Sequence, residues 1–152
     1  MQEGHEFGMR LRKAYLSFHR RANASTQSAG VTADQFVVLS VLAREPGIMQ
    51  ITIVERTASD PNTIAAILRL LEERGLVRRE AHHSDRRARC VFLTAQGRRV
   101  QRRAAKKVGA SLGALWDCVA DSDRGQLTKS LQRIHAAFSV TLATANGRPP
   151  RR

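Results

Sequence analysis

Apolar residues recur at helical spacing over much of this chain. The clearest stripe consists of four residues: Ile64, Ile67, Leu68 and Leu71. Residues spaced in this way share one side of a helix. Asp60 is a good N-cap, Pro61 suits the first helical position, and Gly75 is a natural stop after the last turn. We therefore predict a helix that begins at Pro61 and ends just before Gly75.

Five further helices are predicted along the chain. The first carries an apolar face made of Phe7, Leu11, Tyr15 and Phe18. Thr32 can cap a second helix, which ends at the sequence EPG of residues 45–47. A short third helix is expected near Ile51–Thr57, and a long fifth after Thr94. The sixth begins near Asp121, and its stripe consists of Leu127, Leu131, Ile134, Phe138 and Leu142. The last residues, from Ala145 onward, are expected to form a frayed tail.

Two short β-prone runs follow the Pro61 helix. They are Leu76–Glu80 and Arg89–Leu93, separated by polar residues rich in turn formers. On the return strand, Val91 and Leu93 fall on one face of the strand while Cys90 and Phe92 fall on the other. We predict a β-hairpin at this place.

The side of the Pro61 helix opposite its apolar stripe is polar and slim near its start. That side carries Asn62, Ala66, Arg69 and Glu73, with Thr63 beside it. A helix of this shape can enter a major groove, where Asn and Arg make bidentate contacts with adenine and guanine edges. The alternative is an ordinary amphipathic surface helix.

The tip of the predicted hairpin is basic. Arg86 and Arg87 repel one another unless an anion is expected, and Asp85 partly offsets their charge and could orient a guanidinium. A helix followed at once by an arginine-tipped hairpin suits a protein that reaches two neighbouring grooves of DNA. A solvated basic turn is the alternative.

These residues resemble the MarR family of bacterial winged helix-turn-helix regulators. The matching blocks are GLVRR, DRRA and LTAQG, at Gly75–Arg79, Asp85–Ala88 and Leu93–Gly97. The segment Ser59–Glu72 is similar to the family's recognition helix. The similarity extends more weakly from about Leu11 to about Phe138. One departure is the segment ITIVERTAS, where family members often have an alternating Leu-Ala pattern.

The resemblance implies a mainly α fold, a winged helix-turn-helix with flanking dimerisation helices and a small β-hairpin wing. It places an N-terminal dimerisation helix in 1–30, the DNA-binding region in 31–97, C-terminal dimerisation helices in 98–145 and a flexible tail in 146–152. The residues expected to contact DNA are Asn62, Thr63, Ala66, Arg69, Asp85, Arg86, Arg87 and Arg89. A homodimer would double the phosphate contacts and read an inverted-repeat operator in double-stranded DNA.

Charge agrees with a nucleic-acid partner. The chain has 152 residues and a formal net charge of +13, which is typical of nucleic-acid binding or, less often, of binding to a membrane surface. From Arg78 to Lys107 there are eleven Lys or Arg against two acids. The fifth helix carries two basic rows, made of Arg98, Arg99, Arg102, Arg103, Lys106 and Lys107. These rows fit contact with phosphates, attraction of an anionic ligand, or a merely solvated face.

Other classes of protein find little support in the sequence. No secretory signal is evident and no apolar run approaches the ~18 residues that span a bilayer, so we expect a cytoplasmic protein without membrane contact. Cys90 and Cys118 lack the spacing of metal ligands and are expected to be free thiols. The five histidines are scattered, and His82 and His83 make a poor metal pair. We expect neither an enzyme nor a bound cofactor or metal.

Two functions stay open. The first is a DNA-binding repressor released by a small aromatic or anionic ligand, a CoA thioester included. The residues expected around such a ligand are Arg12, Tyr15, His19, Phe36 and Trp116. Aromatic walls with a few positive groups suit such a molecule; the alternative is that the aromatic residues are core and the arginines face solvent. The second function is a constitutive module that binds DNA or a partner without sensing a small molecule.

Overall fold

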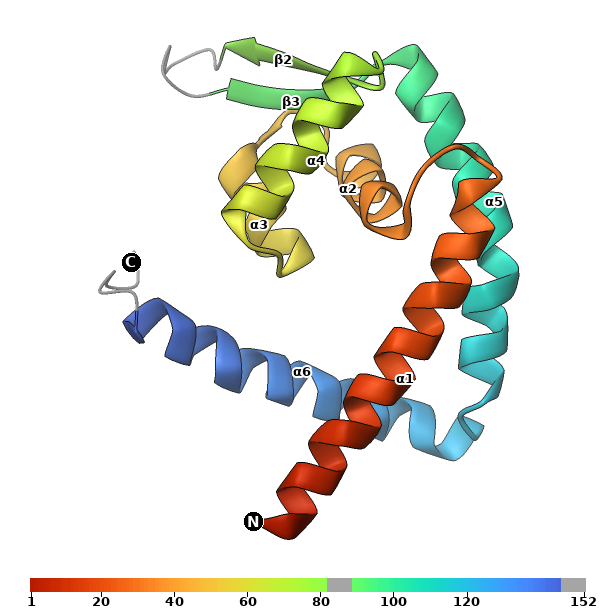
Figure 1. The fold of residues 1–152 in the computed structure, drawn as a ribbon, viewed down its shortest axis with the longest axis vertical. Helices are drawn as coiled ribbons and strands as arrows, with labels where there is room; N and C mark the ends of the chain where they lie inside the picture. The colour runs from red at the N-terminus through yellow and green to blue at the C-terminus, as the bar shows by residue number, and fades with distance from the viewer. Residues whose placement is uncertain (82–88, 146–152) are drawn as a thin grey trace. The chain divides into compact units, whose positions relative to one another are not determined.

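The computed structural model describes residues 1–81 and 89–145, and within this part the chain is mainly helical (Figure 1). The helices are α1 (Gln2–Gln27), α2 (Ala33–Arg44), α3 (Gln50–Thr57), α4 (Pro61–Glu73), α5 (Ala95–Asp117) and α6 (Asp121–Ala145). The strands are β1 (Ile48–Met49), β2 (Val77–Ala81) and β3 (Arg89–Leu93). The predicted helices and the predicted hairpin strands are confirmed. The predicted wing tip at 82–88 and the tail at 146–152 lie outside the described residues.

The chain divides into two compact units, Met1–Leu112 and Gly113–Arg152, and the division falls within α5. In the first unit, α2, α3 and α4 lie beside the β2–β3 hairpin (Figure 1). Cys90 in this unit is buried and Cys118 in the second unit is exposed, and both are free thiols, as predicted.

Local capping explains where α2 and α4 begin. The Thr32 hydroxyl accepts a hydrogen bond from the Gln35 backbone N–H, and the Gln35 side chain accepts one from the Thr32 backbone N–H. This reciprocal pair is a capping box. Asp60 caps α4 by accepting from the Thr63 N–H at 2.9 Å, and Pro61 occupies the first turn. Gly75 follows α4 with a φ of +66°, the left-handed conformation in which glycine is least strained.

The sheet has the order β1-β3-β2, and both pairings are antiparallel. Val77 pairs with Leu93, and Arg79 pairs with Val91, which also pairs with Ile48 of β1. The sequence did not indicate β1, because a strand of two residues is too short to produce a recognisable alternation.

One apolar core holds the winged region together. It combines residues of α2, α3, α4, the hairpin and the first half of α5, and its fully buried members include Leu39, Leu42, Ile53, Ile64, Leu68 and Leu71. Burial of a side chain of this size contributes about 1.5–3 kcal/mol. Several such residues on α4 therefore fix which side of that helix faces inward.

Hydrogen bonds and close packing connect the start of α5 to Gly75 and Leu76, the residues just before β2. The Thr94 hydroxyl donates to the Gly75 carbonyl at 2.7 Å and accepts from the Gly97 N–H at 2.9 Å, so Thr94 caps the start of α5. Gly97 is pressed against the backbone: a Cβ at this position would lie 1.9 Å from the Leu76 carbonyl oxygen. Only glycine permits this approach of α5 to Leu76, the residue before β2.

The second unit is organised around the turn between α5 and α6. Arg124 makes ion pairs with Asp117 and Asp121, and its guanidinium lies 5.0 Å from the ring centroid of Trp116. Its Nη2 also donates to the Trp116 carbonyl at 3.1 Å. Among the described residues of α6, none is buried, and Leu127, Leu131 and Phe138 are exposed.

Candidate nucleic-acid interface

Helix α4 presents a polar face to solvent. The residues of α4 predicted to contact DNA, Asn62, Thr63, Ala66 and Arg69, are all exposed. Ile64, Leu68 and Leu71 on the opposite side have no exposed surface. With 3.6 residues per turn, the inward stripe leaves the predicted set facing outward together.

The N-terminus of α4 is stabilised by an internal acid. The hydroxyl of Thr63 donates to one carboxylate oxygen of Asp60, and the Thr63 backbone N–H donates to the other. The side-chain bond from Thr63, followed by the backbone bond from its N–H, lowers the pKa of Asp60 below its ordinary range. Thr63 therefore holds the cap in the protein without DNA, and its contact with a base stays a prediction.

The Arg69 side chain is accessible to solvent. Its Nε lies 4.0 Å from Oε1 of Glu73, one turn later, and both side chains are largely exposed. Exposed pairs of this kind contribute only about 0–1 kcal/mol. Glu73 thus restrains Arg69 weakly and does not prevent it from turning toward another partner.

An ion pair joins strand β2 of the hairpin to α4. Nε of Arg79 in β2 lies 3.2 Å from Oε2 of Glu72 near the end of α4. Arg89, another residue predicted to contact DNA, is exposed at the first position of β3. The predicted tip residues Asp85, Arg86 and Arg87 lie outside the described residues. Strand β2 therefore lies beside the end of α4.

Polar contacts also fix the far end of α4 and the turn after α2. Arg74 donates from Nη2 to the Gly30 carbonyl at 2.6 Å, which ties the end of α4 to the turn between α1 and α2. Arg56 of α3 donates to both carboxylate oxygens of Glu45, at 2.9 and 3.1 Å. These hydrogen bonds lower the pKa of Glu45.

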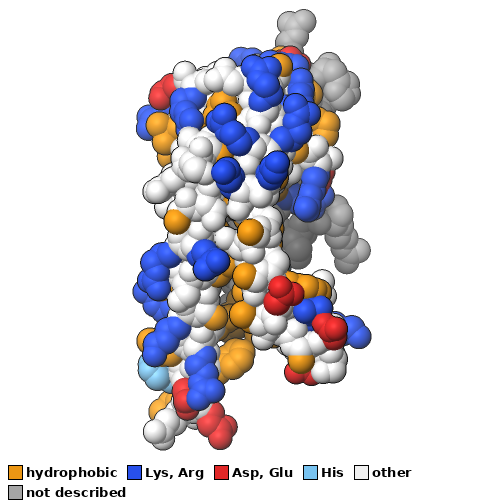
Figure 2. All heavy atoms as spheres, turned by 90° about the vertical axis from the view of Figure 1, so that its right-hand side faces the viewer, with side chains coloured by type: hydrophobic (Ala, Val, Ile, Leu, Met, Phe, Trp, Pro, Cys, Tyr) orange, Lys and Arg blue, Asp and Glu red, His pale blue; other side chains and the backbone are white. Residues whose placement is uncertain are grey.

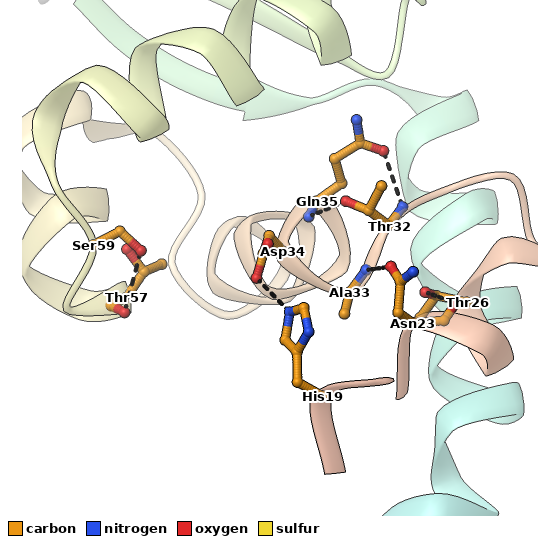
Figure 3. A network of polar contacts seen from close by, with 9 residues as sticks. All are labelled: His19, Asn23, Thr26, Thr32, Ala33, Asp34, Gln35, Thr57 and Ser59. Carbon is orange, nitrogen blue, oxygen red and sulfur yellow. Dashed lines mark hydrogen bonds and ion pairs between the residues drawn. The ribbon is translucent and has the colours of Figure 1, made fainter. Parts of the chain in front are cut away.

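Helix α1 is tied to the start of α2, as Figure 3 shows. The Asn23 side chain accepts from the Ala33 N–H at 3.0 Å, and Nε2 of His19 lies 3.1 Å from Oδ1 of Asp34. Any displacement of the C-terminal half of α1 would therefore act directly on the first helix of the winged region.

The predicted ligand residues belong to three helices of the structure, α1, α2 and α5. Tyr15 and His19 are neighbours on α1, with ring centroids 5.7 Å apart, and Arg12 is exposed one turn before Tyr15. Phe36 of α2 is partly buried against the core. Trp116 belongs to the second unit, where Arg124 covers its ring. Their common role as a ligand site stays a prediction.

The first half of α5 forms a basic surface. Figure 2 shows Lys and Arg side chains gathered over this part of the helix. All six predicted members of the two rows are exposed. Arg98 and Arg103 donate to the carbonyls of Leu93 and Ala29, so these two side chains also brace α5 against its neighbours.

The described residues contain no group of three or more His, Cys, Asp or Glu side chains able to hold a metal ion. In the same part of the chain, no helix is both long enough and apolar enough to cross a bilayer.

Known proteins are similar to this chain in sequence and fold. A family model described as the MarR family matches residues 31–88. The transcriptional regulator HosA of Escherichia coli is 42% identical over 104 residues, which cover 68% of this chain and 71% of HosA.

A solved relative is CouR from Rhodococcus jostii RHA1, described as a transcriptional repressor. Bound to a 23-mer DNA duplex, CouR matches with 30% identity and a TM-score of 0.75. Bound to p-coumaroyl-CoA, it matches with 28% identity and a TM-score of 0.77. Each alignment covers 84% of this chain and 90% of CouR.

The winged-helix architecture and the exposed polar face of α4 are consistent with the function of these relatives. HosA and CouR are both regulators of transcription. The chain belongs to the MarR family of transcriptional regulators.

Proposed function

We propose that this protein is a homodimeric repressor that binds an inverted-repeat operator and leaves it when a small aromatic or anionic ligand binds. The observation that carries the proposal is the outward face of α4, which presents Asn62 and Arg69 from a helix whose other side is fully buried. A rigid helix with such a face can present bidentate donors to a major groove.

The hairpin supplies the second part of the DNA contact. Arg86 and Arg87 reach a minor groove and its phosphates, where the negative potential attracts arginine. Asp85 orients a guanidinium, and Arg89 also contacts the DNA. The link between Arg79 and Glu72 supports this arrangement, because it joins the strand leading to the tip with the helix that reads bases.

Dimerisation sets the spacing of the two recognition helices. We assign residues 1–30 and 98–145 to the dimer interface, residues 31–97 to DNA binding, and 146–152 to a tail outside both. Exposed apolar residues on α1 and α6 support this division, Phe7, Tyr15, Leu131 and Phe138 among them. Two copies then place their α4 helices in successive major grooves, about 34–36 Å apart.

The ligand acts by favouring a dimer whose helices no longer match that spacing. CouR is known bound to p-coumaroyl-CoA, and this supports an aromatic acid or a CoA thioester as the ligand class here. We assign Arg12, Tyr15, His19, Phe36 and Trp116 to the effector site. A ligand with equal affinity for both arrangements would shift nothing.

The test is fluorescence anisotropy of labelled operator DNA with and without aromatic acids, phenols and acyl-CoA thioesters. We expect at least one ligand to release the wild-type protein, and the release to weaken when Arg12→Ala is combined with His19→Ala. Release that is unchanged in that variant places the effector site elsewhere. If no ligand of a broad set releases the DNA, the protein is a constitutive DNA-binding module.

A further inference from the structure

A pocket of about 320 Å³ lies on the side of the sheet that faces the start of α5. Its walls come from the end of α2, from the turn that follows it, from β2 and β3, and from the first turns of α5. The apolar part includes Leu42, Pro46 and Phe92, and the charged part consists of Arg78, Arg98 and Arg102. All of these residues belong to the first compact unit. None of the residues assigned to DNA or to the effector lines this pocket.

The ring of Phe92, which forms the aromatic wall of the pocket, has a close neighbour on each of two sides. The hairpin register pairs Arg78 with Phe92, and the guanidinium of Arg78 lies 4.7 Å from the ring centroid. On the other side, Gly47 adopts a φ of +78°, and a Cβ there would lie 2.7 Å from Cε1 of Phe92. The ring is therefore fixed in place before any ligand arrives, which reduces the entropy lost on binding.

The charged wall comes from β2 and α5. Arg98 and Arg102 are one turn apart on α5 and face the same side. Nη1 of Arg98 donates to the Leu93 carbonyl at 3.1 Å, and Arg78 pairs with Glu80, which does not line the pocket. Arg102 makes no hydrogen bond or ion pair with another residue of the described ranges 1–81 and 89–145. No carboxylate lines the pocket among these residues, so its field is positive.

We infer that this pocket binds a small aromatic carboxylate, with its ring among Leu42, Pro46 and Phe92 and its carboxylate at Arg102. Apolar walls with a few convergent polar groups are typical of ligand sites, whose volumes run from about 300 to 1,000 Å³. The volume here is at the lower end of that range, which fits a one-ring acid and excludes enclosure of a whole CoA thioester. A pocket built only for phosphate would not need the apolar walls. The site is thus a second ligand site, separate from the proposed effector site.

The occupant would bridge the hairpin and α5. Arg78 stands next to Arg79, whose ion pair with Glu72 joins β2 to α4. A ligand that contacts both Phe92 and Arg102 therefore holds β3 to α5, and β3 is paired with β2, the strand that follows α4.

The direct test is titration of the full-length protein with 4-fluorobenzoate, followed by ¹⁹F NMR in the absence of DNA. We expect saturable binding that benzoate displaces, while benzamide, which lacks the charge, and acetate, which lacks the ring, compete much more weakly. Arg102→Gln should weaken binding about tenfold or more, as expected for loss of a charge-assisted hydrogen bond. Lys106→Gln is the matched control: it removes one charge one turn later on α5, outside the pocket lining, and should leave affinity unchanged.

Three results would overturn the inference. They are the absence of saturable binding, equal affinity in Arg102→Gln and wild type, and competition by acetate as strong as by benzoate, which indicates a general anion site. Loss of binding in the variant that combines Arg12→Ala with His19→Ala, but not in Arg102→Gln, would assign the ligand to the proposed effector site instead. Because the titration contains no DNA, its failure leaves the proposed repressor function standing, and a failure of operator binding leaves this pocket standing.

Discussion

Helices α4 and α6 carry similar apolar stripes, yet only one of them buries its stripe within the described chain. Ile64, Leu68 and Leu71 of α4 have no exposed surface. Leu127, Leu131 and Phe138 of α6 are 43, 45 and 68% exposed. The two helices form for the same local reason, but α4 is covered by the rest of the winged core, whereas α6 keeps an apolar face available.

This difference suggests how the two regions divide the work. In our proposal α4 reads bases, which requires a fixed orientation, and the core around α4 supplies that orientation from residues of its own chain. An interface between two copies instead requires apolar surface that stays accessible until the partner arrives. In our proposal α6 meets that requirement, so the winged region is stable by itself and the α6 region depends on protein concentration.

The largest effect is expected where the hairpin, α4 and α5 meet. Gly97→Ala puts a Cβ 1.9 Å from the Leu76 carbonyl oxygen, and backbone atoms cannot give way as a flexible side chain can. We expect a loss of at least about 3 kcal/mol, the upper end for overpacked positions, or failure to fold. Urea unfolding followed by far-UV circular dichroism measures the change.

Gly109→Ala is the matched control on the same helix. No described atom beyond its own helical neighbours lies within 4 Å of a Cβ at Gly109, so the substitution should stabilise α5 by about 0.5–1 kcal/mol. Equal effects of the two substitutions would contradict the close approach of α5 to the hairpin.

The second effect concerns the exposed stripe of α6. Combining Leu127→Lys with Leu131→Lys should convert the proposed dimer into a monomer, because charges would be buried at the interface without partners. Size-exclusion chromatography with light scattering measures the mass. The winged region should keep its helical signal.

Combining Gln126→Lys with Gln132→Lys adds the same charge to α6 beside the stripe and should leave the mass unchanged. If wild type is already a monomer at micromolar concentration, the apolar face of α6 is not a dimer interface.

The two regions also differ in how far the sequence predicts them. For α4, the cap at Asp60, the proline after it and the glycine stop are local signals, and the structure confirms all three. The hairpin strands were predicted to within one residue. The strand β1 was not predicted, because two residues carry no periodicity of their own.

The pocket beside the hairpin could not be predicted from the sequence. Leu42, Arg78 and Arg102 are far apart in the chain, and only the packing of α2, the sheet and α5 brings them together. One signal did exist, since Phe92 falls on the face of its strand opposite to Val91 and Leu93. The hairpin register then places Arg78 across from it, and this register follows from the strand ends and the turn length.

The third effect tests the outward face of α4. Arg69→Ala should weaken binding to the operator by about 1–3 kcal/mol if Arg69 makes a bidentate contact with guanine. Binding to random DNA should weaken less, because a base contact contributes only at its own sequence. Anisotropy titrations with both DNAs at one salt concentration measure the difference, and equal losses would make Arg69 a phosphate anchor.

Changing both Arg86 and Arg87 to Ala is the contrasting variant. Phosphate contacts are independent of sequence, so binding to both DNAs should weaken, and the slope of log affinity against log salt should flatten by up to ~2. An unchanged slope would remove the wing from the interface.

The smallest effect is the pH dependence of the cap at Asp60. Hydrogen bonds from Thr63 lower the pKa of Asp60 in the folded protein. A carboxylate with a lowered folded pKa stabilises the fold fully above its unfolded pKa of about 4, and this contribution is lost as the pH falls through the folded value. Asp60→Ser keeps a capping oxygen but cannot ionise. Urea midpoints of wild type and Asp60→Ser should therefore differ more at pH 7 than at pH 3, and a difference that is the same at both pH values would show that the charge of Asp60 does not contribute to the cap.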